Sequence, residues 1–128
     1  MAEDNRGDVH LVQLALREHG VPFTMRVAND GELALDVVNR LGKDEKVPDL
    51  AVLDLNLPRQ EGEKVLRSLR SHPCCGTTPV IVMTSSLNQR DRAVAERYNA
   101  EYFVKPTDLN AFLELGALVK KLFPQSNN

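Results

Sequence analysis

Five side chains of this sequence have the types and positions that suit phosphoryl-transfer chemistry. Glu3 and Asp4 form an acidic pair, while Asp54, Thr84 and Lys105 each follow a short apolar run. Several carboxylates stay ionised together only beside a counter-charge, which a hard divalent ion such as Mg²⁺ supplies through oxygen ligands. An aspartate can act as a nucleophile, and a metal ion, an ammonium and a hydroxyl neutralise a transferred phosphoryl group. Asp54, Mg²⁺, Lys105 and Thr84 make such a set.

Each of these residues has an ordinary structural explanation when it is taken alone. An aspartate often ends a strand at a turn, a lysine is usually solvated, and a threonine often caps a turn. The pair Glu3-Asp4 could complement the dipole of a helix that begins near Gly7. The order along the chain favours a site, because the acidic pair, Asp54, Thr84 and Lys105 each close a successive predicted strand.

The strands that would position these residues alternate with segments of helical period. Four short apolar or aromatic runs predict strands at 23–28, 50–53, 80–83 and 102–104. Apolar residues at helical spacing predict helices from about 7 to 19, across 33–41 and 65–69, from about 89 to 98, and across 109–122 after a Thr107-Asp108 cap. Such alternation requires parallel pairing through right-handed crossovers, so the predicted class is α/β with a doubly wound sheet. Sites in such sheets lie at the carboxyl ends of the strands.

Composition narrows the class of protein. The chain has 128 residues, 42% hydrophobic and 27% charged, which is typical of one globular domain. Its net charge is −2 and it has no basic cluster, so nucleic acid is not expected as a partner. No apolar run approaches the roughly 18 residues of a membrane helix, and the start does not resemble a signal peptide, so we expect a cytoplasmic protein. Cys74 and Cys75 lack metal-site spacing and are expected to be reduced thiols, with a strained vicinal disulfide as the alternative.

The sequence resembles a two-component response regulator receiver domain (CheY-like) over essentially its whole length. The resemblance rests on an ordered set of motifs: Glu3-Asp4-Asn5, Asn29-Asp30-Gly31, Pro48-Asp49-Leu50, Leu53-Asp54-Leu55-Asn56-Leu57-Pro58, Gly62, Pro79 to Thr84, and Lys105-Pro106. It implies a flavodoxin-like, five-stranded parallel sheet of order 2-1-3-4-5 with helices on both faces. Residues 1–124 would form the receiver domain, and 125–128 a polar tail.

The resemblance also assigns the acceptor and the metal ligands. Asp54 would accept a phosphoryl group from a phosphohistidine of a sensor histidine kinase or a phosphotransfer protein. Glu3, Asp4, Asp54 and the backbone carbonyl of Asn56 would surround Mg²⁺ or Mn²⁺. Beyond self-phosphorylation from small donors and self-dephosphorylation, no enzymatic activity is expected.

The remaining roles concern the response to phosphorylation. Thr84 and Lys105 would bind the phosphoryl oxygens, and Tyr102 falls at the aromatic switch position of the family. The side chains of Asn56 and Ser86 would flank the path of the attacking water and tune dephosphorylation. The Lys105-Pro106 peptide bond is expected to be cis, and a half-buried Tyr102 that does not switch remains an alternative.

The expected output is a change of protein surface. Phosphorylation would shift the population of conformations and alter the face formed by the fourth helix, the last strand and the last helix, which could bind a second copy or a downstream partner. Nothing after Pro124 in this sequence could bind DNA or catalyse a reaction. The motifs are similar to those of stand-alone regulators that partner bacterial phytochrome kinases.

One departure from the family concerns the first strand, which is truncated because only Met1 and Ala2 precede the acidic pair. In the family this strand is central, and unsatisfied buried backbone groups cost roughly 1 to 3 kcal/mol each. We therefore expect residues upstream of Met1 in the native chain, or a late start of the numbering. A receiver-like interaction module that signals without phosphorylation is the leading alternative function.

Two other classes of protein fit the residues less well. A haloacid-dehalogenase-type phosphatase would carry a second aspartate at the position of Asn56 and a cap domain. A flavodoxin-like flavin binder would need phosphate-binding donors where Arg6-Gly7-Asp8 offers an acid.

Overall fold

A computed structural model describes residues 1–59, 61–85 and 88–123 of the chain. Its sheet has three parallel strands in the order β1-β2-β3, formed by Ala51–Asp54, Val80–Thr84 and Glu101–Val104. The central strand β2 is buried at every position, as its unbroken apolar sequence predicts. Asp54 pairs with Met83, and Thr84 pairs with Val104, so the carboxyl ends of all three strands lie at one edge.

The start of the chain extends this sheet by a single residue. Ala2 forms parallel bridges with both Ala28 and Leu53. Its N–H donates to Val52 O at 2.8 Å, and Asp54 N–H donates to Ala2 O at 2.9 Å. On the other side, Glu3 N–H donates to Ala28 O at 3.0 Å. The chain start therefore lies between segment 23–28 and β1, as the predicted order 2-1-3-4-5 requires.

Two of the five predicted strands are reduced to these bridges. The truncation of the first strand is confirmed, and the strand predicted at 23–28 is absent apart from its bridge at Ala28. The physical reason is the short ladder between them, since only Met1 and Ala2 precede Glu3 in this sequence and few backbone groups are available to pair with 23–28. The strand order that remains, with helices on both faces, is still that of a flavodoxin-like sheet.

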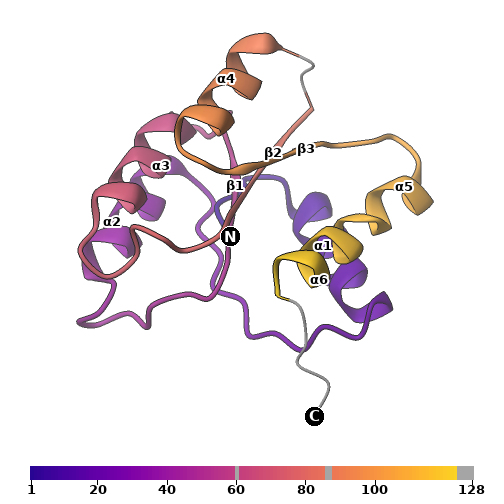
Figure 1. The fold of residues 1–128 in the computed structure, drawn as a ribbon, viewed down its shortest axis with the longest axis horizontal. Coiled ribbons are helices and arrows are strands. Elements are labelled where there is room, and N and C mark those ends of the chain that lie inside the picture. Colours follow the sequence, from indigo (N-terminus) through magenta and orange to yellow (C-terminus); the bar gives the residue numbers. More distant parts are fainter. Residues whose placement is uncertain (60, 86–87, 124–128) are drawn as a thin grey trace.

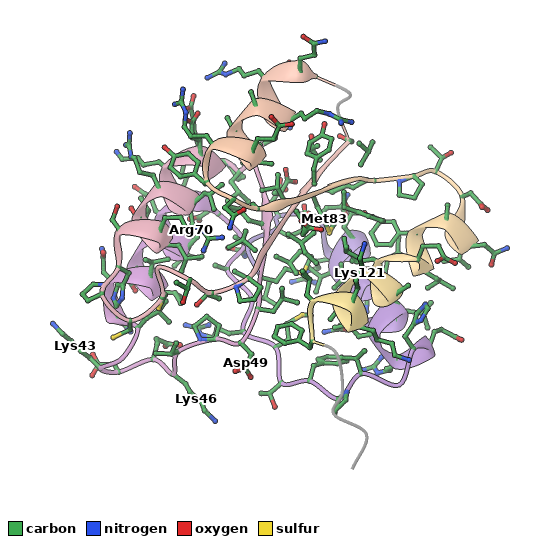
Figure 2. All side chains as sticks on the ribbon, viewed as in Figure 1. Lys43, Lys46, Asp49, Arg70, Met83 and Lys121 are labelled. Atoms are coloured by element: carbon green, nitrogen blue, oxygen red, sulfur yellow. The ribbon has the colours of Figure 1, made fainter. Side chains whose placement is uncertain are left out.

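Helices cover both faces of the sheet (Figure 1). The six helices of the described residues are α1 (Arg6–Glu18), α2 (Gly31–Arg40), α3 (Gly62–Ser71), α4 (Gln89–Arg97), α5 (Leu109–Leu113) and α6 (Leu115–Leu122). Helices α1, α5 and α6 lie on one face, and α2, α3 and α4 lie on the other. Alternate residues of β2 point to opposite faces of the sheet. Ile81 and Met83 belong to the hydrophobic core beneath α1, α5 and α6, and Val80 and Val82 belong to the core beneath α2, α3 and α4. Met83, labelled in Figure 2, is fully buried.

The last predicted helix is interrupted by one residue. Asp108 caps α5 by accepting from Ala111 N–H at 3.3 Å, as the Thr107-Asp108 signal predicts. At Glu114, however, the chain tightens into three-residue turns, in which Glu114 N–H donates to Ala111 O and Ala117 N–H donates to Glu114 O. The single helix predicted over 109–122 is therefore α5 followed by α6.

Two further observations concern the class of protein. Cys74 and Cys75 are both free thiols, as expected, the first exposed and the second buried. Of the helices in the described ranges, none has both the length and the apolar character needed to span a bilayer.

Candidate functional site

Three carboxylates meet at the carboxyl edge of the sheet. Glu3, Asp4 and Asp54 each offer an oxygen, and these oxygens all lie within 4.8 Å of one another. The side chains of Glu3 and Asp54 are buried, and that of Asp4 is exposed. The bridge at Ala2 places the acidic pair beside the end of β1, where Asp54 is the last residue. The prediction that the acidic pair and Asp54 come together is confirmed.

Lys105 is the cation of this cluster. Its Nζ lies 2.8 Å from Asp8 Oδ2, 2.9 Å from Glu3 Oε1 and 3.1 Å from Asp54 Oδ2, and its side chain is only 11% exposed. Burial opposes the charge of the ammonium, but the contacts with Asp8, Glu3 and Asp54 outweigh it and raise the pKa of Lys105. Lys105 is therefore a permanent positive charge beside the predicted acceptor.

Glu3 has one buried carboxylate oxygen without a hydrogen-bond donor in the part of the chain that the structure describes. Its Oε2 accepts from Asn5 N–H at 3.2 Å, whereas Oε1 forms the ion pair with Lys105 without hydrogen-bond geometry and has no donor among the described residues. Burial raises the pKa of Glu3 to about 7, against the opposing ammonium of Lys105 and with the help of the nearby charge of Asp54. A buried oxygen that lacks a donor, next to two further carboxylates, fits a hard divalent cation with oxygen ligands.

The carboxylate of Asp54 is oriented from both sides. Asn56 N–H donates to Oδ1 at 2.8 Å, and Lys105 lies at Oδ2. Helix α3 begins directly against this turn, where Gly62 N–H donates to Leu55 O at 3.1 Å. A Cβ on Gly62 would collide with the backbone of Asp54 and Leu55, so glycine is needed for this close approach. The metal-ligand role of the Asn56 carbonyl stays a prediction.

Thr84 ends β2 but its hydroxyl is engaged by a helix. Its side chain is fully buried, and Oγ1 donates to Asp91 Oδ2 in the first turn of α4 at 3.0 Å. The backbone N–H of Lys105 donates to Thr84 O at 2.7 Å, which ties the ends of β2 and β3 together. Thr84 and Lys105 are therefore neighbours at the edge of the sheet, as the sequence predicts.

Tyr102 is half-buried on β3, with the guanidinium of Arg92 over its ring at 5.1 Å from the ring centre. Its switching role remains a prediction, and Ser86 lies outside the described residues.

The prediction of a cis Lys105–Pro106 bond is wrong for this structure, in which the bond is trans. The trans isomer is favoured by about 0.5 to 1 kcal/mol for such bonds, and it already brings the lysine to the carboxylates.

Sequence reasoning missed two site residues, Asp8 and Asp91. Both lie in the first turn of a helix, where an acid is explained by the helix dipole alone. Asp8 stands four residues after Asp4, in the first turn of the helix that begins just after the acidic pair. That spacing is the one signal that could have identified Asp8.

Comparison with known proteins is consistent with this geometry. A family model described as "Response regulator receiver domain" matches residues 1–115. Rcp1 of Synechocystis sp. is 33% identical over 93 residues, which cover 71% of this chain and 63% of Rcp1. ArlR of Staphylococcus epidermidis is 31% identical over 114 residues, or 88% of this chain and 48% of ArlR. The chain thus spans about half to two thirds of the length of these two relatives.

Solved structures give the same result. The phosphorylated cyanobacterial phytochrome response regulator RcpA superposes with a TM-score of 0.83 at 29% identity, over 99% of this chain and 93% of RcpA. The Mn²⁺-bound form of Rcp1 has the same TM-score at 26% identity, over 99% and 94% of the two chains.

The family match ends at residue 115, so the predicted domain end at 124 stays a prediction, and the predicted tail 125–128 lies outside the described residues. The match over most of the chain, the fold and the acidic site together set aside the phosphatase and flavin-binding alternatives. They show that the chain belongs to the response regulator receiver domain family, the phosphoacceptor modules of two-component signalling.

Proposed function

We propose that Asp54 is the phosphoacceptor of this receiver domain and that Mg²⁺ or Mn²⁺ supports its phosphorylation. The observation that carries the proposal is the position of Asp54 between Lys105, at 3.1 Å, and the carboxylates of Glu3 and Asp4. Glu3, Asp4, Asp54 and the carbonyl of Asn56 would hold the cation. The bound cation would neutralise charge on the carboxylates and on the transferred group.

The two oxygens of Asp54 suggest how the acceptor works. Oδ1 is fixed by Asn56 N–H, and Oδ2 lies beside the ammonium of Lys105. We assign Oδ2 as the nucleophile, because a phosphoryl group bound there lies within reach of Lys105. Oδ2 forms the new bond to phosphorus while the bond from phosphorus to the donor's imidazole nitrogen breaks, and the electron pair leaves with the imidazole. The product is an acyl phosphate on Asp54.

The donor is proposed to be a phosphohistidine of a sensor histidine kinase or of a phosphotransfer protein. The likeness to RcpA, a phytochrome response regulator, supports a phytochrome-type kinase. We place the protein in the cytoplasm and expect no nucleic-acid ligand. Apart from self-phosphorylation by small donors and self-dephosphorylation, which Asn56 and Ser86 would tune, the domain acts through protein contact.

The response would begin at Thr84 and Tyr102. In the structure, both contact the first turn of α4, Thr84 through Asp91 and Tyr102 through Arg92. When the Thr84 hydroxyl donates to a phosphoryl oxygen, it leaves Asp91, and the first turn of α4 loses one of its contacts with β2. The face formed by α4, β3 and the last helices is thus the proposed surface for a second copy or a downstream partner.

The test is intact mass after incubation with acetyl phosphate and Mg²⁺. We expect the wild-type chain to gain the mass of one phosphoryl group, only with a divalent cation present, and Asp54→Asn to gain none. Lys105→Ala should retain some labelling while losing the change at the α4 face. A folded wild-type chain that gains no mass would support the alternative, an interaction module that signals without phosphorylation.

A further inference from the structure

The ammonium of Lys105 has a third carboxylate partner outside the acidic pair and the acceptor. Its 2.8 Å contact with Asp8 is the shortest of its three ion pairs and joins residues 97 positions apart in the chain. Asp8 comes from α1, whereas Asp54 ends β1. The contact is a hydrogen-bonded ion pair at the site, in which the Asp8 side chain is only 19% exposed.

Asp8 is held in place by the cap of its helix. The side-chain oxygen of Asn5 accepts from Gly7 N–H at 2.8 Å and from Asp8 N–H at 3.2 Å. These bonds fix the backbone of the first turn of α1, and with it the position of the Asp8 carboxylate. Asp8 is therefore a fixed partner of Lys105 and cannot be treated as a mobile surface acid.

Three carboxylates surround the ammonium of Lys105. It donates hydrogen bonds to Asp8 and Asp54, and it lies 2.9 Å from Glu3 Oε1 in an ion pair. A phosphoryl group on Asp54 adds oxygen acceptors with further negative charge at the same ammonium. Asp54 carries the group and Glu3 would be occupied by the cation, so Asp8 is the partner that competes with the phosphoryl oxygens for this ammonium.

We propose that Asp8 is a positioning residue that holds Lys105 before phosphorylation and competes with the incoming phosphoryl group for its ammonium. The inference rests on the proposed function of Asp54. It makes Asp8 a determinant of how readily this site accepts small anionic donors, because its charge both occupies Lys105 and repels the donor. A dianionic donor is affected more strongly than a monoanionic one.

The experiment compares Asp8→Asn, Asp8→Ser and Asp8→Glu with the wild-type chain. Rates of phosphorylation are measured with acetyl phosphate, a dianion at neutral pH, and with phosphoramidate, which carries one net negative charge. Binding of fluoroberyllate at saturating Mg²⁺ reports the competition without any chemical step. Glu18→Gln is the matched control, since it removes the same charge from an exposed position at the other end of α1.

We expect Asp8→Asn and Asp8→Ser to react roughly threefold to tenfold faster with acetyl phosphate and to bind fluoroberyllate more tightly by a similar factor. The ratio of the acetyl phosphate rate to the phosphoramidate rate should rise, a change that a general loss of stability would not produce. Glu18→Gln should behave like the wild type, and Asp8→Glu, which keeps the charge on a longer side chain, should fall between the wild type and the neutral variants.

Two results would overturn the inference. One is an unchanged donor ratio and fluoroberyllate affinity in both neutral variants while the wild type is phosphorylated normally. The other is an equal slowing with both donors, which would show that Asp8 assists phosphorylation instead of competing with it. If the folded wild type accepts no phosphoryl group from either donor, the proposed function itself fails and this inference falls with it.

Discussion

The hydroxyl of Thr84 donates a 3.0 Å hydrogen bond to the carboxylate of Asp91, which joins the end of β2 to the first turn of α4. The next residue on that turn, Arg92, places its guanidinium over the ring of Tyr102. Two consecutive residues of α4 thus contact the two residues predicted to respond to phosphorylation. The first turn of α4 is therefore well placed to transmit the state of the site to the surface.

Replacing Asp91 should favour the phosphorylated conformation. Asp91→Ala removes a charged acceptor, and hydrogen bonds to charged groups contribute about 1.5 to 3 kcal/mol. We expect the free energy of unfolding of the unphosphorylated domain to fall by about 1 to 2 kcal/mol, measured in urea. Because the Thr84 hydroxyl no longer has to leave Asp91, fluoroberyllate should bind roughly tenfold more tightly.

Asp91→Asn is the control for this prediction, since it keeps an oxygen acceptor for Thr84 without the charge. Its affinity for fluoroberyllate should lie between those of the wild type and Asp91→Ala. An affinity in Asp91→Ala that equals or falls below the wild-type value would show that the bond to Asp91 does not oppose the response.

The central part of the fold could be predicted because its sequence signals are local. The runs at 50–53 and 80–83 are apolar throughout, and they form β1 and β2 within one residue of the predicted bounds. The apolar and aromatic residues of segment 23–28 are typical of a strand, but its place in a sheet depends on a partner segment, and the truncated first strand offers it few backbone groups. The break at Glu114 has only a weak sequence signal, Gly116 two residues later, because Leu113, Leu115 and Ala117 around it are good helix formers.

The site residues that could be predicted from the sequence are those that lie at the ends of strands. Glu3, Asp4, Asp54 and Lys105 converge because the carboxyl ends of parallel strands share one edge. Asp8 and Asp91 reach the same edge from helices, and the direction of a helix relative to the sheet is set by tertiary packing. Apart from the closeness of Asp8 to the acidic pair in the sequence, nothing in the residue type of an acid in a first helical turn separates a site residue from a partner of the helix dipole.

The buried carboxyl of Glu3 should make metal binding depend on pH. Its pKa is raised from 4.5 to about 7 by burial, so without metal the folded domain binds more protons than the unfolded chain between these values. Its contribution to stability therefore falls as pH rises through that window. A cation requires the ionised carboxylate, so Mg²⁺ binding should release a proton and strengthen as pH rises from 6 to 8, by at most about tenfold per pH unit.

Isothermal titration of Mg²⁺ at pH 6, 7 and 8, in buffers of different ionisation enthalpy, measures both the affinity and the released protons. Glu3→Gln should bind Mg²⁺ more weakly and lose most of this pH dependence. The same pH dependence in Glu3→Gln and the wild type would assign the proton to another group.

Arg70 should be a major source of stability outside the site. This side chain of α3, labelled in Figure 2, donates to Tyr98 O and Thr78 O at 2.6 Å, to Asn99 O at 3.2 Å and to Gly76 O at 3.3 Å. One guanidinium thus joins the end of α3 to the segment before β2 and to the turn between α4 and β3. Burial lowers the pKa of Arg70, but an arginine stays protonated at all ordinary pH values.

Removing this guanidinium leaves several carbonyl groups without a donor. We expect Arg70→Ala to lower the free energy of unfolding by about 2 to 4 kcal/mol, measured by urea denaturation. Arg70→Lys should recover only part of the loss, because an ammonium cannot reproduce the planar set of donors. Arg67→Ala, at an exposed position on the same helix, should change stability by less than about 0.5 kcal/mol. Equal effects at the two positions would contradict the prediction.

The substitution Gly62→Ala tests whether the close approach of α3 to the end of β1 matters, because helix propensity and steric contact change the stability in opposite directions. On helix propensity alone, Gly62→Ala should stabilise α3 by up to about 1 kcal/mol. A Cβ at this position, however, meets the backbone of Asp54 and Leu55, which cannot move aside as a flexible side chain can. We expect the free energy of unfolding, measured by urea denaturation, to fall by about 1 to 3 kcal/mol. We also expect slower phosphorylation by acetyl phosphate, because the displaced backbone carries the acceptor.

Gly7→Ala is the matched control in the first turn of α1, where the new Cβ meets only the side-chain oxygen of Asn5. If Gly62→Ala were as stable and as reactive as Gly7→Ala, the approach of α3 to the end of β1 would not be what positions Asp54.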